Sequence, residues 1–334
     1  MTIRERQERD EEARLSPYAA LSSRSAGRAH PISTCDLRTC YQRDRDRIIH
    51  CKSFRRLKYK TQVFLTPMGD HYRTRLTHTL EVSQVARTLA RSLRLNEDLT
   101  EAAALGHDLG HTPFGHIGES TLNRLLPGGF RHNEQSLRVA ERLENDGQGL
   151  NLCRETLDGI LNHSGQNEPK TLEGWCVRRA DRIAYINHDI DDAIRGGILK
   201  PFELPRRCLS VLGETHGERI DTMIRDIVTT SMDQPFVRMS EEVRQASEEL
   251  RAFLFEYVYH DEWRKKEESR CDYILSALYE HYLAHPEQLP AEYLEINFTE
   301  GAERAVCDFI ACMTDRYAID QFSEIFVPGA FGRR

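Results

Sequence analysis

Apolar side chains recur at intervals of three and four residues along most of this chain, the spacing that places them on one face of an α-helix. The first clear series is Leu80, Val85, Leu89 and Leu93, which predicts an amphipathic helix over 76–95. The alternation of apolar and polar residues that marks a half-buried strand is scarce. The predicted fold class is therefore all-α, a helical bundle.

The same periodicity predicts further helices. The second begins after Asn96, a residue type that caps helix N-termini, and carries Leu99. Others are predicted over 132–143, 152–163, 172–194, 209–230, 240–260 and 264–283. Gly196 and Gly197 end the longest of these. Turn residues between short extended flanks predict a small β-hairpin near 63–72.

Composition along the chain predicts three segments. Residues 1–30 combine a charge run with Ser, Ala and Gly, so they are expected to be flexible or loosely docked. Residues 31–200 form the predicted core. Residues 201–334 are predicted to be a helical C-terminal region that packs on the core and contributes additional helices.

Bulk properties exclude several classes of protein. No apolar run approaches the roughly 20 residues that span a bilayer. The charged N-terminus also lacks the features of a secretory signal. A cytoplasmic protein without a membrane partner is therefore expected. The nine cysteines include no C-x-x-C pair, which argues against a disulfide framework and a zinc-finger cage. Cys153, Cys176 and Cys307 are instead expected to be buried small hydrophobes.

The net charge of −7 argues against nucleic acid as the main partner, because binding the phosphate backbone requires a positive face. Residues 43–60 nevertheless carry a run of Arg and Lys with only Asp44 and Asp46 against it. One interpretation is a solvated helix face. The other is a confined basic patch for a small polyanion such as a nucleoside triphosphate.

The densest group of chemically active side chains lies in 103–119. It contains His107, Asp108, His111, His116 and Glu119. A lone histidine is usually a surface or hydrogen-bonded core residue. Three histidines and two carboxylates beside helix-breaking glycines are hard to explain as packing, because each buried polar group needs its own partner. Imidazole and carboxylate ligands suit a divalent metal ion.

Two other predicted helices offer residues that complete a metal site. His78 lies on the polar edge of the first helix, and Asp181 lies in the helix over 172–194. In that helix a polar series recurs at helical spacing, namely Asp181, Tyr185, His188 or Asp189, and Asp192. The opposite face is apolar, so the helix is predicted to be half core and half cavity wall. The alternative is an ordinary solvent-facing stripe.

The order His78, His107-Asp108, Asp181 resembles the H…HD…D signature of the HD superfamily, an all-α fold whose four residues hold one metal or part of a two-metal site. The flanking blocks FRRLKYKTQVF, RTRLTHTLEV, HDLGHTPFGHIGE, RHNEQS and ADRIAYINHDIDD resemble the branch of dGTPases and dNTP triphosphohydrolases. These blocks cover about 43–197, so 31–200 is expected to be an HD-type catalytic core. CDFIACMTDRYA, over 307–318, resembles the C-terminal helix of that family.

This resemblance implies metal-dependent hydrolysis of deoxynucleoside triphosphates, dGTP among them, to a deoxynucleoside and inorganic triphosphate. The metal, one of Mg, Mn, Co, Ni, Fe or Zn, would be held by His78, His107, Asp108 and Asp181. The resemblance also implies a homo-oligomer, a tetramer or hexamer, and a regulatory nucleotide as a second partner.

Further residues receive catalytic or substrate-binding roles. His116 is the candidate general acid, and Glu119, three residues later, would orient it. His111 and His132 would lie close to the phosphates. By resemblance, Arg75, Arg182 and Tyr185 would contact the phosphate chain, whereas Gln62 and Asp189 would read the sugar 3′-hydroxyl. Tyr185 packed against the deoxyribose would leave no room for a ribose 2′-hydroxyl.

Alternatives remain for these residues and for the function. The alternative role for Arg75 and Arg182 is a structural ion pair with neighbouring carboxylates, and the alternative for Tyr185 is a position in the core. The rival enzyme is an HD-type phosphodiesterase or nucleotidase that acts on other phosphate esters. The rival without catalysis is an HD module that senses dNTPs.

Overall fold

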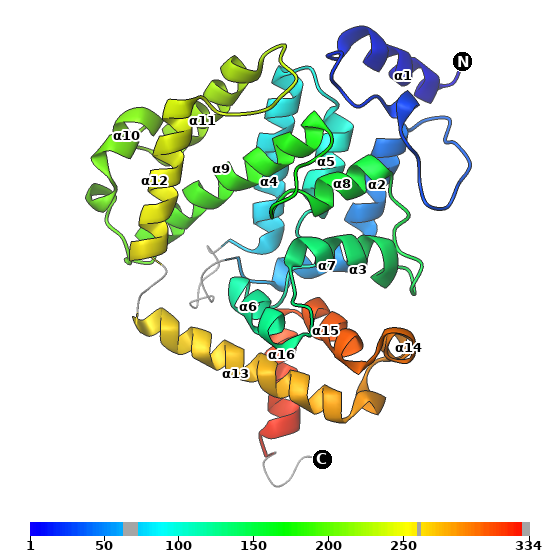
Figure 1. Ribbon diagram of the computed structural model, residues 1–334, viewed down its shortest axis with the longest axis vertical. Coiled ribbons are helices and arrows are strands. Elements are labelled where there is room, and N and C mark those ends of the chain that lie inside the picture. The colour runs from blue at the N-terminus through cyan, green and yellow to red at the C-terminus, as the bar shows by residue number, and fades with distance from the viewer. Residues whose placement is uncertain (63–72, 259–261, 329–334) are drawn as a thin grey trace. The chain divides into compact units, whose positions relative to one another are not determined.

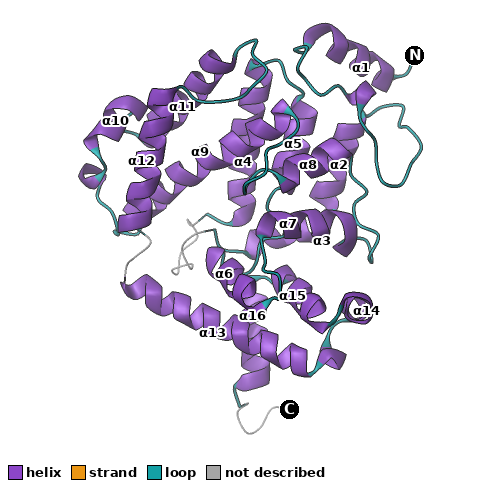
Figure 2. Ribbon diagram, in the orientation of Figure 1, coloured by secondary structure: helices purple, strands orange, loops and turns teal. Residues whose placement is uncertain are grey.

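The computed structural model describes residues 1–62, 73–258 and 262–328, and every regular element in this part is helical (Figures 1 and 2). Within it, extended pairing is limited to two isolated antiparallel bridges, Arg28 with Cys153 and Thr61 with Thr74. The predicted all-α class is confirmed. The hairpin predicted near 63–72 lies outside the described residues.

The α-helices vary from one and a half to almost seven turns. They are α1 (Ile3–Arg14), α2 (Cys40–His50), α3 (Lys52–Arg56), α4 (Arg75–Ser92), α5 (Glu97–Gly106), α6 (His116–Leu125), α7 (His132–Arg138), α8 (Arg154–Leu161), α9 (Leu172–Arg195), α10 (Arg206–Leu212), α11 (His216–Ser231), α12 (Glu241–Tyr257), α13 (Glu262–Ala284), α14 (Ala291–Glu300), α15 (Ala302–Cys312) and α16 (Asp315–Phe326). No helix of the described residues combines the length and the apolar character needed to cross a membrane.

The chain forms two compact units whose segments interleave in sequence. The first unit comprises Met1–Cys51, Thr77–His107 and Leu150–Asp261, and the second comprises Lys52–Leu76, Asp108–Gly149 and Glu262–Arg334. Each unit therefore draws on chain from both sides of residue 200, where the sequence analysis placed the boundary between the core and the C-terminal region.

Helix α9 is the central helix of the first unit, where α5, α8, α11 and α12 pack against it. It starts where the Thr171 hydroxyl accepts a hydrogen bond from the Gly174 amide at 3.1 Å. Its apolar face, with Val177, Ile183 and Ile190, is fully buried. Burying each of these side chains contributes about 1.5–3 kcal/mol to the stability of the folded state. The buried face therefore determines how α9 is rotated about its axis, and so in which direction its polar side chains point.

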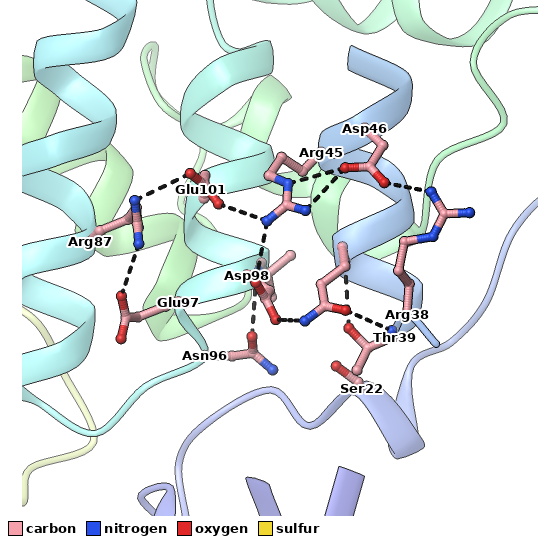
Figure 3. Close-up of polar contacts among 12 residues, drawn as sticks. Ser22, Arg38, Thr39, Arg45, Asp46, Arg87, Asn96, Glu97, Asp98 and Glu101 are labelled. Atoms are coloured by element: carbon pink, nitrogen blue, oxygen red, sulfur yellow. Dashed lines mark hydrogen bonds and ion pairs between the residues drawn. The ribbon is translucent and has the colours of Figure 1, made fainter. Parts of the chain in front are cut away.

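Charged side chains connect α2, α4 and α5 of the first unit (Figure 3). Arg45 of α2 contacts two carboxylates. Its nitrogen atoms lie 3.0 Å from Asp46 of the same helix and 3.4 Å from Glu101 of α5. Arg87 of α4 contacts Glu97 at 3.6 Å and Glu101 at 3.3 Å. These pairs are partly exposed, so each contributes only about 0–1 kcal/mol to stability. Because Glu101 of α5 contacts both Arg45 of α2 and Arg87 of α4, the pairs chiefly align the three helices.

The N-terminal segment makes specific hydrogen bonds within the first unit. Helix α1 begins with a capping box between Thr2 and Glu5. The Ala20 amide donates to the buried carboxylate of Glu173 on α9 at 2.9 Å. Arg28 donates to the buried carboxylate of Asp44, which also accepts from the Thr156 hydroxyl at 2.7 Å. Residues 1–30, expected to be flexible or loosely docked, thus contact α2 and α9 through buried acids.

Two predicted helices are each divided in the structure, and these predictions were wrong. The helix expected over 209–230 is interrupted between α10 and α11. Gly213 adopts a φ of +110°, which only glycine tolerates well, and a capping box between Thr215 and Glu218 starts the next helix. The single C-terminal helix expected over 307–318 is likewise divided, because Thr314 caps the start of α16.

The second unit has its own hydrophobic core, in which α13 packs against α6, α15 and α16. Leu122, Leu275 and Ile310 are fully buried at its centre. The cysteines of the chain are free thiols. Cys153, Cys176 and Cys307 are completely buried, which confirms their predicted role as small hydrophobes.

We expect Asp44→Ala to lower the free energy of unfolding by about 3 kcal/mol or more, because it leaves the buried Arg28 guanidinium without its counter-charge. Chemical denaturation followed by helical circular dichroism measures this change. The control is Arg225→Ala, which removes an exposed pair with Asp221 and should change stability by less than about 0.5 kcal/mol. Equal effects of the two substitutions would contradict the anchoring role of Asp44.

Candidate active site

His107 lies directly after the last residue of α5 and is buried. Its Nδ1 is 2.6 Å from the carbonyl oxygen of Ala104. Because a carbonyl can only accept, Nδ1 is the donor in this hydrogen bond. The bond thus orients the ring of His107 so that Nε2 is the ring nitrogen that can bind a metal.

Three of the predicted metal ligands meet within the first unit. The Oδ1 atom of Asp181 on α9 is 3.2 Å from Nε2 of His78 on α4 and 3.8 Å from Nε2 of His107. The rings of His78 and His107 are 5.7 Å apart. Burial acts to raise the pKa of Asp181, but the hydrogen bond from His78 and the neighbouring imidazoles outweigh it and hold the pKa below its ordinary value.

The chemistry of this donor set fits a divalent cation. Two imidazole nitrogens and one carboxylate oxygen converge, and both histidines are at least 98% buried. Imidazole and carboxylate are the donors that Mn, Fe, Co, Ni and Zn share. A hydrogen bond from His107 to a backbone carbonyl, as found here, is also how metal-binding histidines are commonly oriented.

Asp108, the fourth predicted ligand, follows His107 in the chain and belongs to the second unit. There its carboxylate accepts from Nη1 of Arg75 at 2.6 Å, and both side chains are buried. Arg75 also donates to the carbonyl of Gln62 at 3.3 Å. The ion pair considered as an alternative role for Arg75 is therefore present, and the assignment of Asp108 to the metal stays a prediction.

The first unit brings further histidines to this group, namely His188, which belongs to the polar series of α9, and His163 and His216, which no predicted site included. Ring contacts of 4.9–6.0 Å form a series from His163 through His107, His78 and His188 to His216. Nε2 of His188 is 3.2 Å from the carboxylate of Glu81. Glu81 follows His78 by three residues on the same helix, a spacing that could have identified it. No local pattern identifies His163 or His216, because their neighbours come from distant segments.

The loop after Asp108 is held against α7 by close backbone contact. The Gly110 amide donates to the Ser136 hydroxyl at 2.9 Å, and a Cβ atom at Gly110 would lie 2.1 Å from the Ser136 nitrogen. Lys60 donates from Nζ to the carbonyls of His111 and, at 2.8 Å, Ala311. Burial lowers the pKa of Lys60 to about 7. These contacts fix the backbone that carries His111.

Glu119 of α6 is the centre of a second group, all within the second unit. Its Oε2 is 3.4 Å from Nδ1 of His116 and 4.0 Å from Nε2 of His111. Its Oε1 accepts from Nδ1 and the backbone amide of His132, at 2.8 and 2.9 Å. Burial acts to raise the pKa of Glu119, but the hydrogen bonds from His116 and His132 dominate, so its pKa is strongly lowered. Glu119 is therefore an ionised carboxylate surrounded by imidazoles.

The three imidazoles around Glu119 differ in exposure and in charge. His111 stacks on His132 with ring centroids 4.8 Å apart. Burial, with the nearby charge of Arg75, lowers the pKa of His111. Burial lowers the pKa of His132, but the hydrogen bond to Glu119 and the charge of that carboxylate raise it by more, so the pKa is raised overall. The side chain of His116 is 54% exposed, so it is the imidazole of this group that a substrate can reach.

The remaining predicted substrate residues have different environments. Asp189 is buried, and Tyr185 is partly buried. Gln62 is buried, and its Oε1 has no hydrogen-bond partner among the described residues. Arg182 lines a cavity with Arg179 and has no ion pair with a described carboxylate, unlike Arg75. Their contacts with substrate stay predictions.

Comparison with known families gives two matches along the chain. The HD domain family matches residues 75–186, a span that contains His78, His107, Asp108 and Asp181. The phosphohydrolase-associated domain family matches residues 237–324.

Individual relatives are similar over nearly their whole length. A deoxyguanosinetriphosphate triphosphohydrolase-like protein of Caldanaerobacter subterraneus subsp. tengcongensis is 59% identical over 328 residues, which cover 98% of this chain and 97% of that protein. A protein of the same name from Clostridium perfringens strain 13 is 51% identical, with 98% of each chain covered. One from Bordetella pertussis is 41% identical and covers 94% of this chain and 97% of its own.

We expect Gly110→Ala to destabilise the second unit by about 3 kcal/mol, because the added Cβ would overlap the backbone of α7 and neither segment can shift cheaply. Thermal unfolding of the purified variant measures this loss. Gly217→Ala on α11 is the control, since nothing lies within 4 Å of its Cβ. It should be neutral or stabilise the protein by about 0.5–1 kcal/mol. Equal unfolding midpoints for Gly110→Ala and Gly217→Ala would contradict the need for close contact between the loop at Gly110 and α7.

Proposed function

Because the chain belongs to the family of deoxyguanosinetriphosphate triphosphohydrolase-like proteins and carries its HD domain, we propose that it hydrolyses deoxynucleoside triphosphates in a metal-dependent reaction. The products would be a deoxynucleoside and inorganic triphosphate. The observation that carries this proposal is the meeting of His78, His107 and Asp181 on one point, in the residue order of the HD signature.

The proposed ligands of a divalent metal are His78, His107, Asp108 and Asp181. Three of them converge, and the fourth is joined to His107 by a peptide bond. When bound, a divalent ion would neutralise charge on the phosphoryl oxygens and lower the pKa of a coordinated water. The hydrogen bond from Nδ1 of His107 to the Ala104 carbonyl leaves Nε2 as the ring nitrogen that would bind the ion.

His116 is the proposed general acid for the departing 5′ oxygen. Its Nδ1 faces the carboxylate of Glu119, which leaves Nε2 to carry a proton toward substrate. An ionised Glu119 stabilises the imidazolium and orients the ring. The backbone and side-chain bonds from His132 hold Glu119 in place, so the carboxylate does not have to reorganise when the proton moves.

Substrate contacts are proposed for further residues. His111 and His132 would lie close to the phosphates, and Arg75, Arg182 and Tyr185 would bind the phosphate chain. Gln62 and Asp189 would read the 3′-hydroxyl. The Oε1 of Gln62 supports this role, because it is buried and has no partner among the residues that the structure describes, and a substrate hydroxyl would satisfy it. Tyr185 packed against the sugar would exclude a ribose 2′-hydroxyl and so select deoxyribose.

The direct test is an assay of the purified protein against the four dNTPs and GTP, with Mg, Mn or Co added. We expect inorganic triphosphate and deoxynucleoside in equal amounts. Release of orthophosphate, or of a nucleoside monophosphate, would instead indicate an HD-type phosphodiesterase or nucleotidase. Saturable dNTP binding without turnover under every metal condition would indicate a sensing module.

Two substitutions separate the metal from the proton transfer. We expect His116→Ala to lower kcat by about a hundredfold to ten-thousandfold while bound metal, measured by elemental analysis, is retained. Asp181→Ala should lose both turnover and metal, because it removes the carboxylate that lies 3.2 Å from Nε2 of His78 and 3.8 Å from Nε2 of His107.

Matched controls are available for both substitutions. His285 is half-exposed and 3.4 Å from Glu287, so His285→Ala removes a similar imidazole and carboxylate pair elsewhere in the second unit. Asp221→Ala removes an exposed carboxylate of the first unit. Both controls should retain turnover and metal. Turnover of His116→Ala at the rate of His285→Ala would remove His116 from the mechanism.

A further inference from the structure

A single carboxylate, that of Asp315, binds two segments of the second unit that carry proposed active-site residues. Asp315 is the first residue of α16. Its Oδ1 accepts a hydrogen bond from the backbone amide of Phe114 at 2.9 Å, two residues before His116. Its Oδ2 accepts from the amide of Thr61 at 2.8 Å and also from the Thr61 hydroxyl, one residue before Gln62. The two oxygens thus hold segments that are distant from each other in the sequence.

The corner before α6 consists of Phe114 and Gly115, whose backbone conformation is unfavourable. Phe114 has a φ of +60° and Gly115 a φ of +59°, and His116 begins α6 directly after them. The left-handed region is costly for a bulky residue because the Cβ atom comes too close to the following carbonyl oxygen. Such a conformation persists only where the surrounding structure fixes it. A corner that is released would therefore move the start of α6.

Other contacts of the corner involve different atoms. The Thr112 hydroxyl donates to the Gly115 carbonyl at 2.9 Å. The side chain of Phe114 is buried in the core of the second unit. A Cβ atom at Gly115 would lie 2.8 Å from the carbonyl oxygen of Gln62, so the two segments that Asp315 binds also touch each other. None of these contacts satisfies the Phe114 amide, whose acceptor is Asp315.

The end of α15 binds the residue before Thr61. Nζ of the buried Lys60 donates to the carbonyl oxygen of Ala311 at 2.8 Å. This bond holds the chain up to Lys60, whereas the bonds to Asp315 hold Thr61 itself. Loss of the Asp315 carboxylate would therefore leave Lys60 anchored and release the backbone from Thr61 onward, together with the corner.

The ordinary role of an acidic residue at this place is to stabilise its own helix. Asp315 lies in the first turn of α16, where a negative charge is favourable. The capping hydrogen bond, however, is made by Thr314, whose hydroxyl accepts from the Tyr317 amide at 3.2 Å. Both oxygens of Asp315 accept from other segments. Substitution of the two neighbours one at a time therefore separates the stability of α16 from the contacts with Thr61 and the corner.

We propose that Asp315 is a positioning residue that holds His116 and Gln62 in place relative to each other. Its carboxylate fixes the corner from which α6 presents the proposed general acid, and it fixes the segment that presents the proposed reader of the sugar 3′-hydroxyl. Proton transfer requires the acid within about 3 Å of the departing oxygen, and a misplacement of about 1 Å can lower the rate about a hundredfold. This role rests on the proposed hydrolysis of dNTPs, whereas the effect of Asp315 on the backbone does not.

Steady-state kinetics with a dNTP substrate compare the two neighbouring substitutions. Asp315→Ala should lower kcat by about tenfold to a hundredfold and retain the bound metal, because it releases the corner. Thr314→Ala removes the cap of α16 alone, so it should lower the midpoint of thermal unfolding and leave kcat unchanged. An equal loss of kcat in the two variants would show that Asp315 acts only through the stability of α16, and would overturn the proposal.

A second pair of variants tests the contact with Thr61 while Asp315 stays in place. Thr61→Val keeps a similar shape but removes the hydroxyl, one of the three donors to this carboxylate. It should lower kcat/KM by about tenfold. Thr61→Ser keeps the hydroxyl and should recover most of this loss. The same loss in both variants would show that the hydroxyl bond is not needed, and would overturn the positioning of Gln62 by Asp315.

Amide hydrogen exchange, followed by mass spectrometry, measures positioning without substrate or turnover. In Asp315→Ala, peptides over 57–62 and 112–118 should exchange faster than in the unsubstituted protein. In Thr314→Ala, faster exchange should be confined to α16. If the unsubstituted protein releases no triphosphate from any dNTP but shows this exchange pattern, the proposed function fails and the contacts of Asp315 are supported. If it releases triphosphate, and Asp315→Ala keeps both its kcat and its exchange over 112–118, the proposed function stands and the positioning role is overturned.

Discussion

Ionised groups inside this protein are stable only where an opposite charge or several donors face them, and this constraint organises both candidate sites. Asp181 is ionised because His78 and His107 face it, and Glu119 is ionised because His116 and His132 do. In each case the carboxylate also orients the imidazoles that stabilise it.

The fold was predictable wherever local periodicity determines structure. The helix expected over 172–194 is observed as Leu172–Arg195, and Asn96 caps α5 as predicted. The division of 209–230 was missed because one glycine and one capping box outweigh a periodic pattern that continues across them. The interleaving of the two units could not be derived, since periodicity shows which face of a helix is buried but not which helix buries it.

The candidate site was predictable to a similar extent. Residue order and spacing identified His78, His107 and Asp181, which meet, and His116 with Glu119, which also meet. Arg75 was expected to bind the phosphate chain, with a structural ion pair as the alternative, and its pairing with Asp108 depends on a contact across 33 residues. Arg179 and Arg182 line a cavity together with Arg238, which lies more than 50 residues further along the chain, and each of them alone has the pattern of an ordinary surface charge. Only packing brings them together.

The contacts around Lys60 and Phe114 affect how the protein is made. Lys60 bonds to the Ala311 carbonyl, and the Phe114 amide bonds to Asp315, across 251 and 201 residues. A ribosome needs on the order of ten seconds or more to add that much chain. Throughout this time the nascent loop that carries His111 lacks the acceptors that later order it. The second unit therefore matures only when α15 and α16 have emerged, and ribosome stalling before them would leave the loop open to chaperones and proteases.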